Sequence, residues 1–169
     1  MLYPNDSELL RLKQIYAYAA NSPRILWKFE PNAGTAAISP QMILCKEVLK
    51  KVYLPDGLKI INSYTFSGCK RITDLFIPDS VTEIGAYAFQ ECVRLKTIHL
   101  PSKLVKIPEG LFQGCCSLEK VFLADTIERI EDNAFAGCSS LKKPWIPKNI
   151  QYIAENAFPH PEWGKTCET

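Results

Sequence analysis

The chain has 169 residues, of which 47% are hydrophobic and 22% are charged, so it holds enough apolar material for one domain or one short repeat array. Its formal net charge of +2 is too small to indicate nucleic acid or an anionic membrane surface as a partner. No apolar run reaches the roughly 18 residues that a membrane-spanning helix needs, so the sequence predicts no membrane span. The first residues lack the basic and apolar regions of a signal peptide, which predicts a cytoplasmic location. The alternative is the cell surface or secretion, if an export signal has been removed.

Residues 1–45 are predicted to form an N-terminal cap made of a helix, a strand and a degenerate repeat. The sequence Asn-Asp-Ser-Glu near the start resembles a capping box, apolar residues at helical spacing follow it, and Pro23 ends the helix. Ile25, Trp27 and Phe29 then alternate as in a strand. Three apolar residues stand one period before their counterparts in the first regular repeat: Ile38, Ile43 and Leu49. Terminal repeats of a solenoid are atypical because they cover an open end, and a partner-binding helix is the alternative for this segment.

Residues 46–158 carry a 23-residue repeat. Phenylalanines mark it at Phe66, Phe89, Phe112, Phe135 and Phe158. A cysteine follows three residues after each of the first four, at Cys69, Cys92, Cys115 and Cys138. A fixed period of this length is the signature of a solenoid, whose coils stack because no single coil can bury its apolar side alone. We therefore expect the first four phenylalanine rings to be almost fully buried.

One repeat shows how each coil is built. Ile98 and Leu100 alternate with Thr97 and His99, as in a short strand with one apolar face, and Pro101 ends the strand because it cannot donate to a ladder. The same pattern predicts short parallel strands, about 4.8 Å apart, in every repeat. They are expected near residues 51–54, 74–77, 97–100, 120–123 and 143–146.

The segments 77–89 (IPDSVTEIGAYAF) and 135–142 (FAGCSSLK) closely resemble BspA-type leucine-rich repeats, a family common in gut and oral bacteria and in some protozoan parasites. The resemblance covers about residues 46–158. It implies a leucine-rich-repeat solenoid of α/β type, with 23-residue coils of mostly short parallel strands and irregular or 3-10 turns, behind a helical N-terminal cap. It also implies adhesion or protein interaction as the usual role, and the family has no shared catalytic residues to carry over. Many relatives are secreted or surface-bound.

Residues 159–169 are predicted to form a C-terminal cap or tail. The segment is too irregular for another coil, and Trp163 is the side chain expected to cover the exposed end of the stack. Pro144 lies in the last predicted strand and suits a strand with a free edge, because proline has no N–H to donate.

The cysteines and the remaining motifs do not indicate catalysis. Four of the seven cysteines belong to the repeat, where small buried hydrophobic side chains are the favoured interpretation and disulfides between stacked coils the alternative. Close Cys pairs with zinc-site spacing are missing, so we expect reduced, metal-free thiols and no cofactor. The segment 164–166 resembles the end of a P-loop, but Pro159 stands where the first glycine is required. The sequence therefore predicts a protein that is not an enzyme.

The candidate binding site is a column of outward-facing strand positions, again 23 residues apart: Tyr53, Phe76, His99, Phe122 and Trp145. A mixed polar rim flanks it, made of Lys51, Asp74, Lys120 and Lys143. The column is expected to face solvent on the concave side as a stripe about 19 Å long. Exposed aromatic patches with polar rims commonly mark interaction sites. The alternative is that neighbouring rings simply stack and stiffen the sheet.

This column predicts a protein–protein interaction module that binds an unidentified protein partner on its concave, aromatic-lined face. Two alternatives remain open at this point. The chain could be a fragment of an adhesin that binds carbohydrate or another surface polymer, or it could form a homodimer through the stripe.

Overall fold

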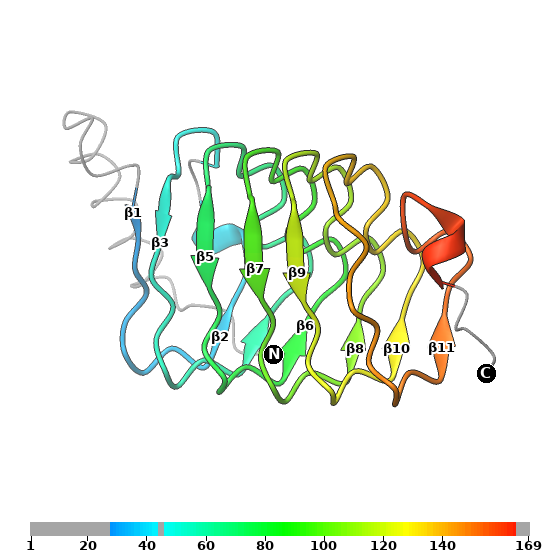
Figure 1. The fold of residues 1–169 in the computed structure, drawn as a ribbon. Helices are drawn as coiled ribbons and strands as arrows, with labels where there is room; N and C mark the ends of the chain where they lie inside the picture. The colour runs from blue at the N-terminus through cyan, green and yellow to red at the C-terminus, as the bar shows by residue number, and fades with distance from the viewer. Residues whose placement is uncertain (1–27, 44–45, 165–169) are drawn as a thin grey trace.

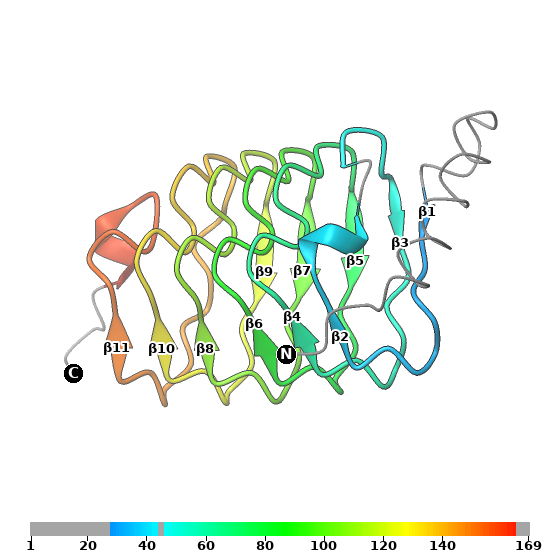
Figure 2. The same cartoon turned by 180° about the vertical axis from the view of Figure 1, so that it is seen from behind.

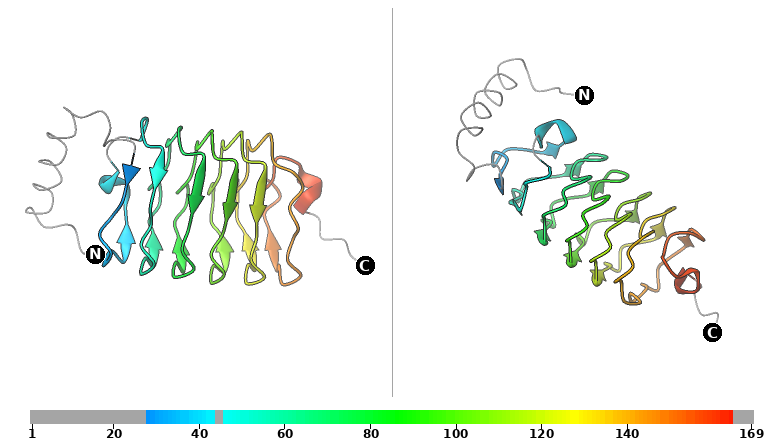
Figure 3. Two further views of the ribbon diagram at one scale, coloured as in Figure 1. Left: turned by 60° about the vertical axis from the view of Figure 1, so that its left-hand side comes forward. Right: turned by 90° about the horizontal axis from the view of Figure 1, so that it is seen from above.

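The computed structural model describes residues 28–43 and 46–164, whose strands form two rows on opposite sides of a solenoid (Figures 1 and 2). The front row comprises β1 (Lys28–Phe29), β3 (Lys51–Val52), β5 (Asp74–Phe76), β7 (Thr97–His99) and β9 (Lys120–Phe122). The back row comprises β2 (Ala37–Ile38), β4 (Ile60–Ile61), β6 (Glu83–Ile84), β8 (Lys106–Ile107), β10 (Arg129–Ile130) and β11 (Tyr152–Ile153). Two short 3-10 helices, η1 (Pro40–Met42) and η2 (Pro161–Gly164), complete the elements. Figure 3 shows the coils stacked along one axis, with η2 at one end.

All ladders are parallel, and each pairs residues that lie 23 positions apart. In the front row Leu75 pairs with Ile98, and Ile98 pairs with Val121. These three side chains point inward and are buried, while the residues directly before and after each of them in its strand point outward. The register confirms the predicted 23-residue coil and the parallel arrangement of its short strands.

The five phenylalanines of the repeat stack in one column through the core, which we call the phenylalanine column: Phe66, Phe89, Phe112, Phe135 and Phe158. The first four rings are fully buried and Phe158 is 4% exposed, as the repeat predicts. Neighbouring rings stack with centroids 5.1–5.7 Å apart. Burial of one such side chain contributes about 1.5–3 kcal/mol, and each stacked pair adds about 0.5–1.5 kcal/mol. At the C-terminal end Trp163 meets Phe158 edge-on at 6.3 Å, the covering position expected from the sequence.

The cysteine column is held by hydrogen bonds between coils. The thiols of Cys92, Cys115 and Cys138 donate to the carbonyl oxygen of the phenylalanine in the preceding coil, at 3.1–3.3 Å. The same carbonyl accepts the backbone N–H of its own coil's cysteine, so the thiol uses the second lone pair. Burial raises the pKa of Cys69 to about 12 and also raises the pKa of Cys138. Within the described ranges these thiols and the exposed Cys116 are free.

The expected strand at residues 143–146 is wrong. This segment lies beside β9, where Lys142 N–H donates to Glu119 O at 3.1 Å, but it forms no strand. In the other coils the N–H at the position of Pro144 faces the following coil, so the missing N–H of Pro144 points away from β9. The remaining front strands end earlier than predicted, for example β5 at Phe76 and β3 at Val52.

The predicted N-terminal helix lies outside the described residues, as does the start of the predicted strand around Trp27. Phe29, the last residue of that strand, is in β1 and meets Phe66 edge-on at 6.1 Å. The next strand of this coil, β2, pairs with β4 and places Ile38 opposite Ile61, both fully buried. The stack therefore begins before the first regular repeat.

The back row is interrupted between β6 and β8, which form separate three-stranded sheets with their other neighbours (Figure 2). In the adjoining coils, Gly85 N–H donates to Ile61 O at 2.8 Å and Glu131 N–H donates to Ile107 O at 3.0 Å. Pro108 occupies the equivalent position and has no N–H. A shallow pocket of about 190 Å³ opens at this break, lined by Thr82, Glu83, Ile84, Leu104, Val105, Lys106 and Arg129.

Candidate functional site

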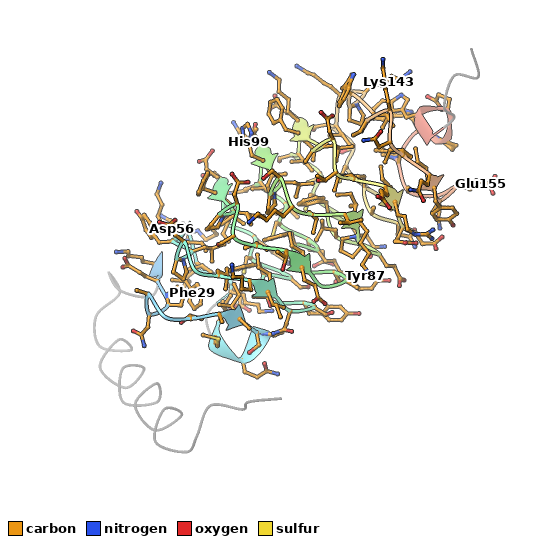
Figure 4. All side chains as sticks on the ribbon, turned by 90° about the horizontal axis from the view of Figure 1, so that it is seen from below. Phe29, Asp56, Tyr87, His99, Lys143 and Glu155 are labelled. Carbon is orange, nitrogen blue, oxygen red and sulfur yellow. The ribbon has the colours of Figure 1, made fainter. Side chains whose placement is uncertain are left out.

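A column of exposed aromatic side chains follows the front row. We call this column the aromatic stripe; it consists of Tyr53, Phe76, His99, Phe122 and Trp145. The exposed fractions of its aromatic members other than the histidine run from 48% to 70%, and His99 is also exposed. Strand alternation explains this orientation, because each member lies between two inward-facing residues of its coil. Figure 4 shows His99 and Lys143 on one side of the solenoid and Tyr87 on the other.

The centre of the stripe is a stacked pair. His99 and Phe122 are register partners in β7 and β9, and their rings lie 4.2 Å apart with planes inclined by 6°. A pair in this geometry covers one ring face of each member and holds both side chains in place. The stacking alternative predicted from the sequence therefore accounts for this one pair.

The two rings that flank the pair are the most exposed. Phe76 is 70% exposed and Trp145 is 62% exposed. Among the described residues, neither ring stacks with another aromatic ring. Trp145 follows Pro144 on a segment without ladder hydrogen bonds, and its side chain projects from the end of the front row. These two rings have free apolar surface that no neighbour covers.

The N-terminal end of the stripe is charged. Lys28 places its Nζ 4.7 Å from the centre of the Tyr53 ring and 2.6 Å from a carboxylate oxygen of Glu30. The hydrogen bond that Lys28 donates to the Glu30 carboxylate raises the pKa of Lys28. Glu30 occupies the stripe position of its coil, 23 residues before Tyr53. The 23-residue offset is the signal in the sequence for this position, but the coil around Glu30 matches the repeat poorly.

The polar rim runs along one side of the stripe. Lys51, Asp74, Lys120 and Lys143 are all exposed and lie two residues before the stripe in each coil, about 6.7 Å along the strand. Asp74 accepts a hydrogen bond from the hydroxyl of Thr73 at 2.7 Å. The three rim lysines form no ion pair with any described residue.

A second row of lysines, absent from the sequence prediction, lies one residue further from the stripe: Lys50, Lys96 and Lys142. The other side of the stripe is different. Prolines follow the strands there, and beyond them come exposed aspartates at Asp56, Asp79 and Asp125. The stripe therefore separates an edge rich in lysine from an edge on which these aspartates lie together with Lys103 and Lys148.

Across residues 28–43 and 46–164, no three histidine, cysteine or acidic side chains gather as metal ligands do. The part of the chain that the structure describes holds no helix long and apolar enough to cross a membrane. The stripe and its rim offer apolar contact and unpaired positive charge over a continuous surface.

Comparisons with known proteins agree on the repeat type. The family model described as the BspA type leucine-rich repeat region matches residues 38–162, in six copies. A leucine-rich repeat protein from Bacteroides ovatus is 28% identical, with a TM-score of 0.71, over 78% of this chain and 34% of that one. A leucine-rich cell surface protein from Faecalibacterium prausnitzii is 36% identical, with a TM-score of 0.60, over 62% of this chain and 27% of that one.

A leucine-rich repeat protein from T. pallidum is 26% identical, with a TM-score of 0.53, over 65% of this chain and 62% of that one. This chain therefore spans about a third or less of the length of the first two relatives. No match is found among curated protein sequences.

Proposed function

This chain belongs to the BspA-type leucine-rich-repeat family, and we propose that it is a non-enzymatic module that binds a protein partner across its aromatic stripe. Membership of the family indicates a protein-interaction or surface-binding role. The observation that carries the proposal is the pair of unstacked rings, Phe76 and Trp145, at 70% and 62% exposure. Large apolar side chains in a continuous exposed row, beside unpaired charge, are typical of interaction sites.

The contrast between rings supports a binding role over a purely structural one. Stacking explains why His99 and Phe122 lie together, but it offers Phe76 and Trp145 no partner within the described chain. Burial of one large apolar side chain contributes about 1.5–3 kcal/mol. A partner that covers these rings would gain this free energy, so the rings serve as its anchors in the proposed complex.

Carbohydrate binding is the second candidate. The F. prausnitzii relative is described as a cell surface protein, and an exposed tryptophan such as Trp145 can also pack on a sugar ring. That relative favours the cell surface as the location for proteins of this repeat type, against the cytoplasm that the first residues predict. Fractionation of the source cells, followed by immunoblotting, decides between the two locations for this chain.

The test of the proposed function compares three proteins against a phage library of random dodecapeptides. They are the wild type, the stripe variant Phe122→Ala/Trp145→Ala, and the back-row control Val105→Ala/Tyr152→Ala, whose two residues are 50% and 40% exposed. We expect peptides that are enriched on the wild type to be retained by the control and lost by the stripe variant, with all three proteins equally folded by circular dichroism. Equal enrichment on the wild type and the stripe variant, or no enrichment on any of the three, refutes the proposal.

Two parallel measurements use the same proteins. Binding to a glycan array that depends on Phe122 and Trp145, without peptide enrichment, would replace the protein partner by a carbohydrate. Sedimentation equilibrium of the wild type that reports a dimer, with a monomer for the stripe variant, would assign the stripe to self-association.

A further inference from the structure

We propose that the partner presents an extended segment that runs along the solenoid axis and alternates apolar with acidic side chains. This inference rests on the proposed function and specifies the ligand of the same surface. It follows from two spacings, that of the coils and that of an extended chain, and from the positions of the free rings and rim lysines.

The first step is a match of lengths. Phe76 and Trp145 are three coils apart, which places them about 14 Å apart along the axis at about 4.8 Å per coil. An extended peptide rises about 3.4 Å per residue, so its positions i and i+4 are also about 14 Å apart and lie on the same side of the strand. One extended segment can therefore place two apolar side chains against both free rings.

The second step concerns the middle of the stripe. The intervening position i+2 faces the same side and falls about 7 Å from each end. The midpoint between Phe76 and Trp145 is the joint of the stacked His99–Phe122 pair, because those rings belong to the two coils in between. The i+2 side chain thus contacts the stacked rings of His99 and Phe122 together. Because the coils repeat about every 4.8 Å and same-side peptide residues about every 6.8 Å, a peptide residue lies directly over a ring only at Phe76 and at Trp145.

The third step concerns the opposite side of the peptide. A segment that lies between the stripe and the rim, which are about 6.7 Å apart, directs its odd positions toward the rim. Position i+3, about 10 Å from Phe76, lies level with Lys120, and position i+5 lies near Lys143. Both lysines are exposed and unpaired within the described chain. Acidic side chains complement them at these two positions.

Position i+1 faces a different part of the rim. It falls between Asp74 and Thr97, neither of which is positively charged, so a small polar side chain fits there. From the Phe76 end to the Trp145 end, the recognised segment is apolar, polar, apolar, acidic, apolar, acidic. Either chain direction satisfies these spacings, and the motif is reversed accordingly.

The experiment uses fluorescein-labelled synthetic peptides and fluorescence anisotropy. Two probes are used. One carries the core Phe-Ser-Phe-Asp-Phe-Asp between glycines, and the other carries the same core in reversed order. One control peptide replaces both aspartates with lysines, and another groups the same residues as Phe-Phe-Phe-Ser-Asp-Asp. We expect one direction of the alternating peptide to bind about tenfold more tightly than either control, because opposed charges raise affinity and wrong spacing leaves anchors unfilled.

Protein variants locate the charge contact. Lys120→Gln/Lys143→Gln should lower the affinity for the alternating peptide about tenfold and flatten its salt dependence. The back-row control Lys59→Gln/Lys106→Gln should leave both unchanged. Equal binding of the lysine peptide, or equal loss in both lysine variants, overturns the inference.

The two proposals fail in different ways. Displayed peptides that need Phe122 and Trp145 but lack the alternation would leave the proposed function intact and overturn this inference. Peptide binding that does not depend on the stripe at all would overturn both. Binding of polyuridylic acid or of an acidic polysaccharide through the same lysines, without binding of any peptide, would assign the surface to another class of polymer and overturn the peptide proposal.

Discussion

Replacement of Phe112 by alanine tests the energetics of the core. Phe112 is fully buried at the middle of the phenylalanine column. Its ring stacks on Phe89 at 5.7 Å and on Phe135 at 5.5 Å. Large-to-small substitution of a buried phenylalanine costs about 3–5 kcal/mol. Two stacked pairs at about 0.5–1.5 kcal/mol each place the expected loss in the upper half of that range.

The free energy of unfolding is measured by urea denaturation followed by circular dichroism, with the melting temperature as a second readout. For a chain of this size a loss of about 3–5 kcal/mol lowers the melting temperature by about 6–20 °C. The matched control is Phe122→Ala: the ring is 48% exposed and stacks on one neighbour, so a loss of about 0.5–1.5 kcal/mol is expected. A Phe112→Ala loss below about 1.5 kcal/mol, or a loss equal to that of the control, would show that the column does not hold the coils together as argued.

Four further predictions concern single coils. In the native protein Cys116 should react with a thiol reagent far faster than the buried Cys69, and a comparable rate would contradict the packing. Burial raises the pKa of Cys69 from 9.0 to about 12, so the folded protein holds the neutral thiol at pH values where the unfolded chain has lost the proton. The contribution of the buried thiol to the free energy of unfolding is therefore complete below pH 9 and declines between pH 9 and about 12, and the urea midpoint should fall over that window. The amide of Val105, at the break in the back row, should exchange with deuterium faster than that of Glu128, which donates to Val105 O at 2.7 Å, and slower exchange would indicate an unbroken ladder. Gly110→Ala should destabilise the fold by about 1–3 kcal/mol, because φ is +57° and the new Cβ would clash with the ring of Tyr87 in the preceding coil. A neutral result in urea denaturation would refute that contact.

Part of the candidate site could be predicted and part could not. Alternation along an extended backbone directs Phe76 and Trp145 outward, although residues 143–146 form no strand, so the stripe and its rim follow from the 23-residue period. The division of the stripe into the stacked pair His99–Phe122 and the two unstacked rings depends on the side-chain rotamers of these residues, which are set by contacts with neighbouring coils. The ion pair of Lys28 with Glu30 belongs to a coil whose departure from the repeat conceals its register.

The 23-residue coil, the in-register parallel pairing and the buried phenylalanine column were determined by the sequence itself, because in a solenoid each residue's neighbour lies a fixed number of positions away. Tertiary structure alone decided where the ladders break. Pro108 lacks the N–H that its equivalents Gly85 and Glu131 donate to the preceding coil, and residues 143–146 do not continue the front-row ladder beyond β9. It also decided that the cysteine thiols donate to phenylalanine carbonyls of the preceding coil, since a hydrogen bond requires the distance and direction that only the stacked coils supply.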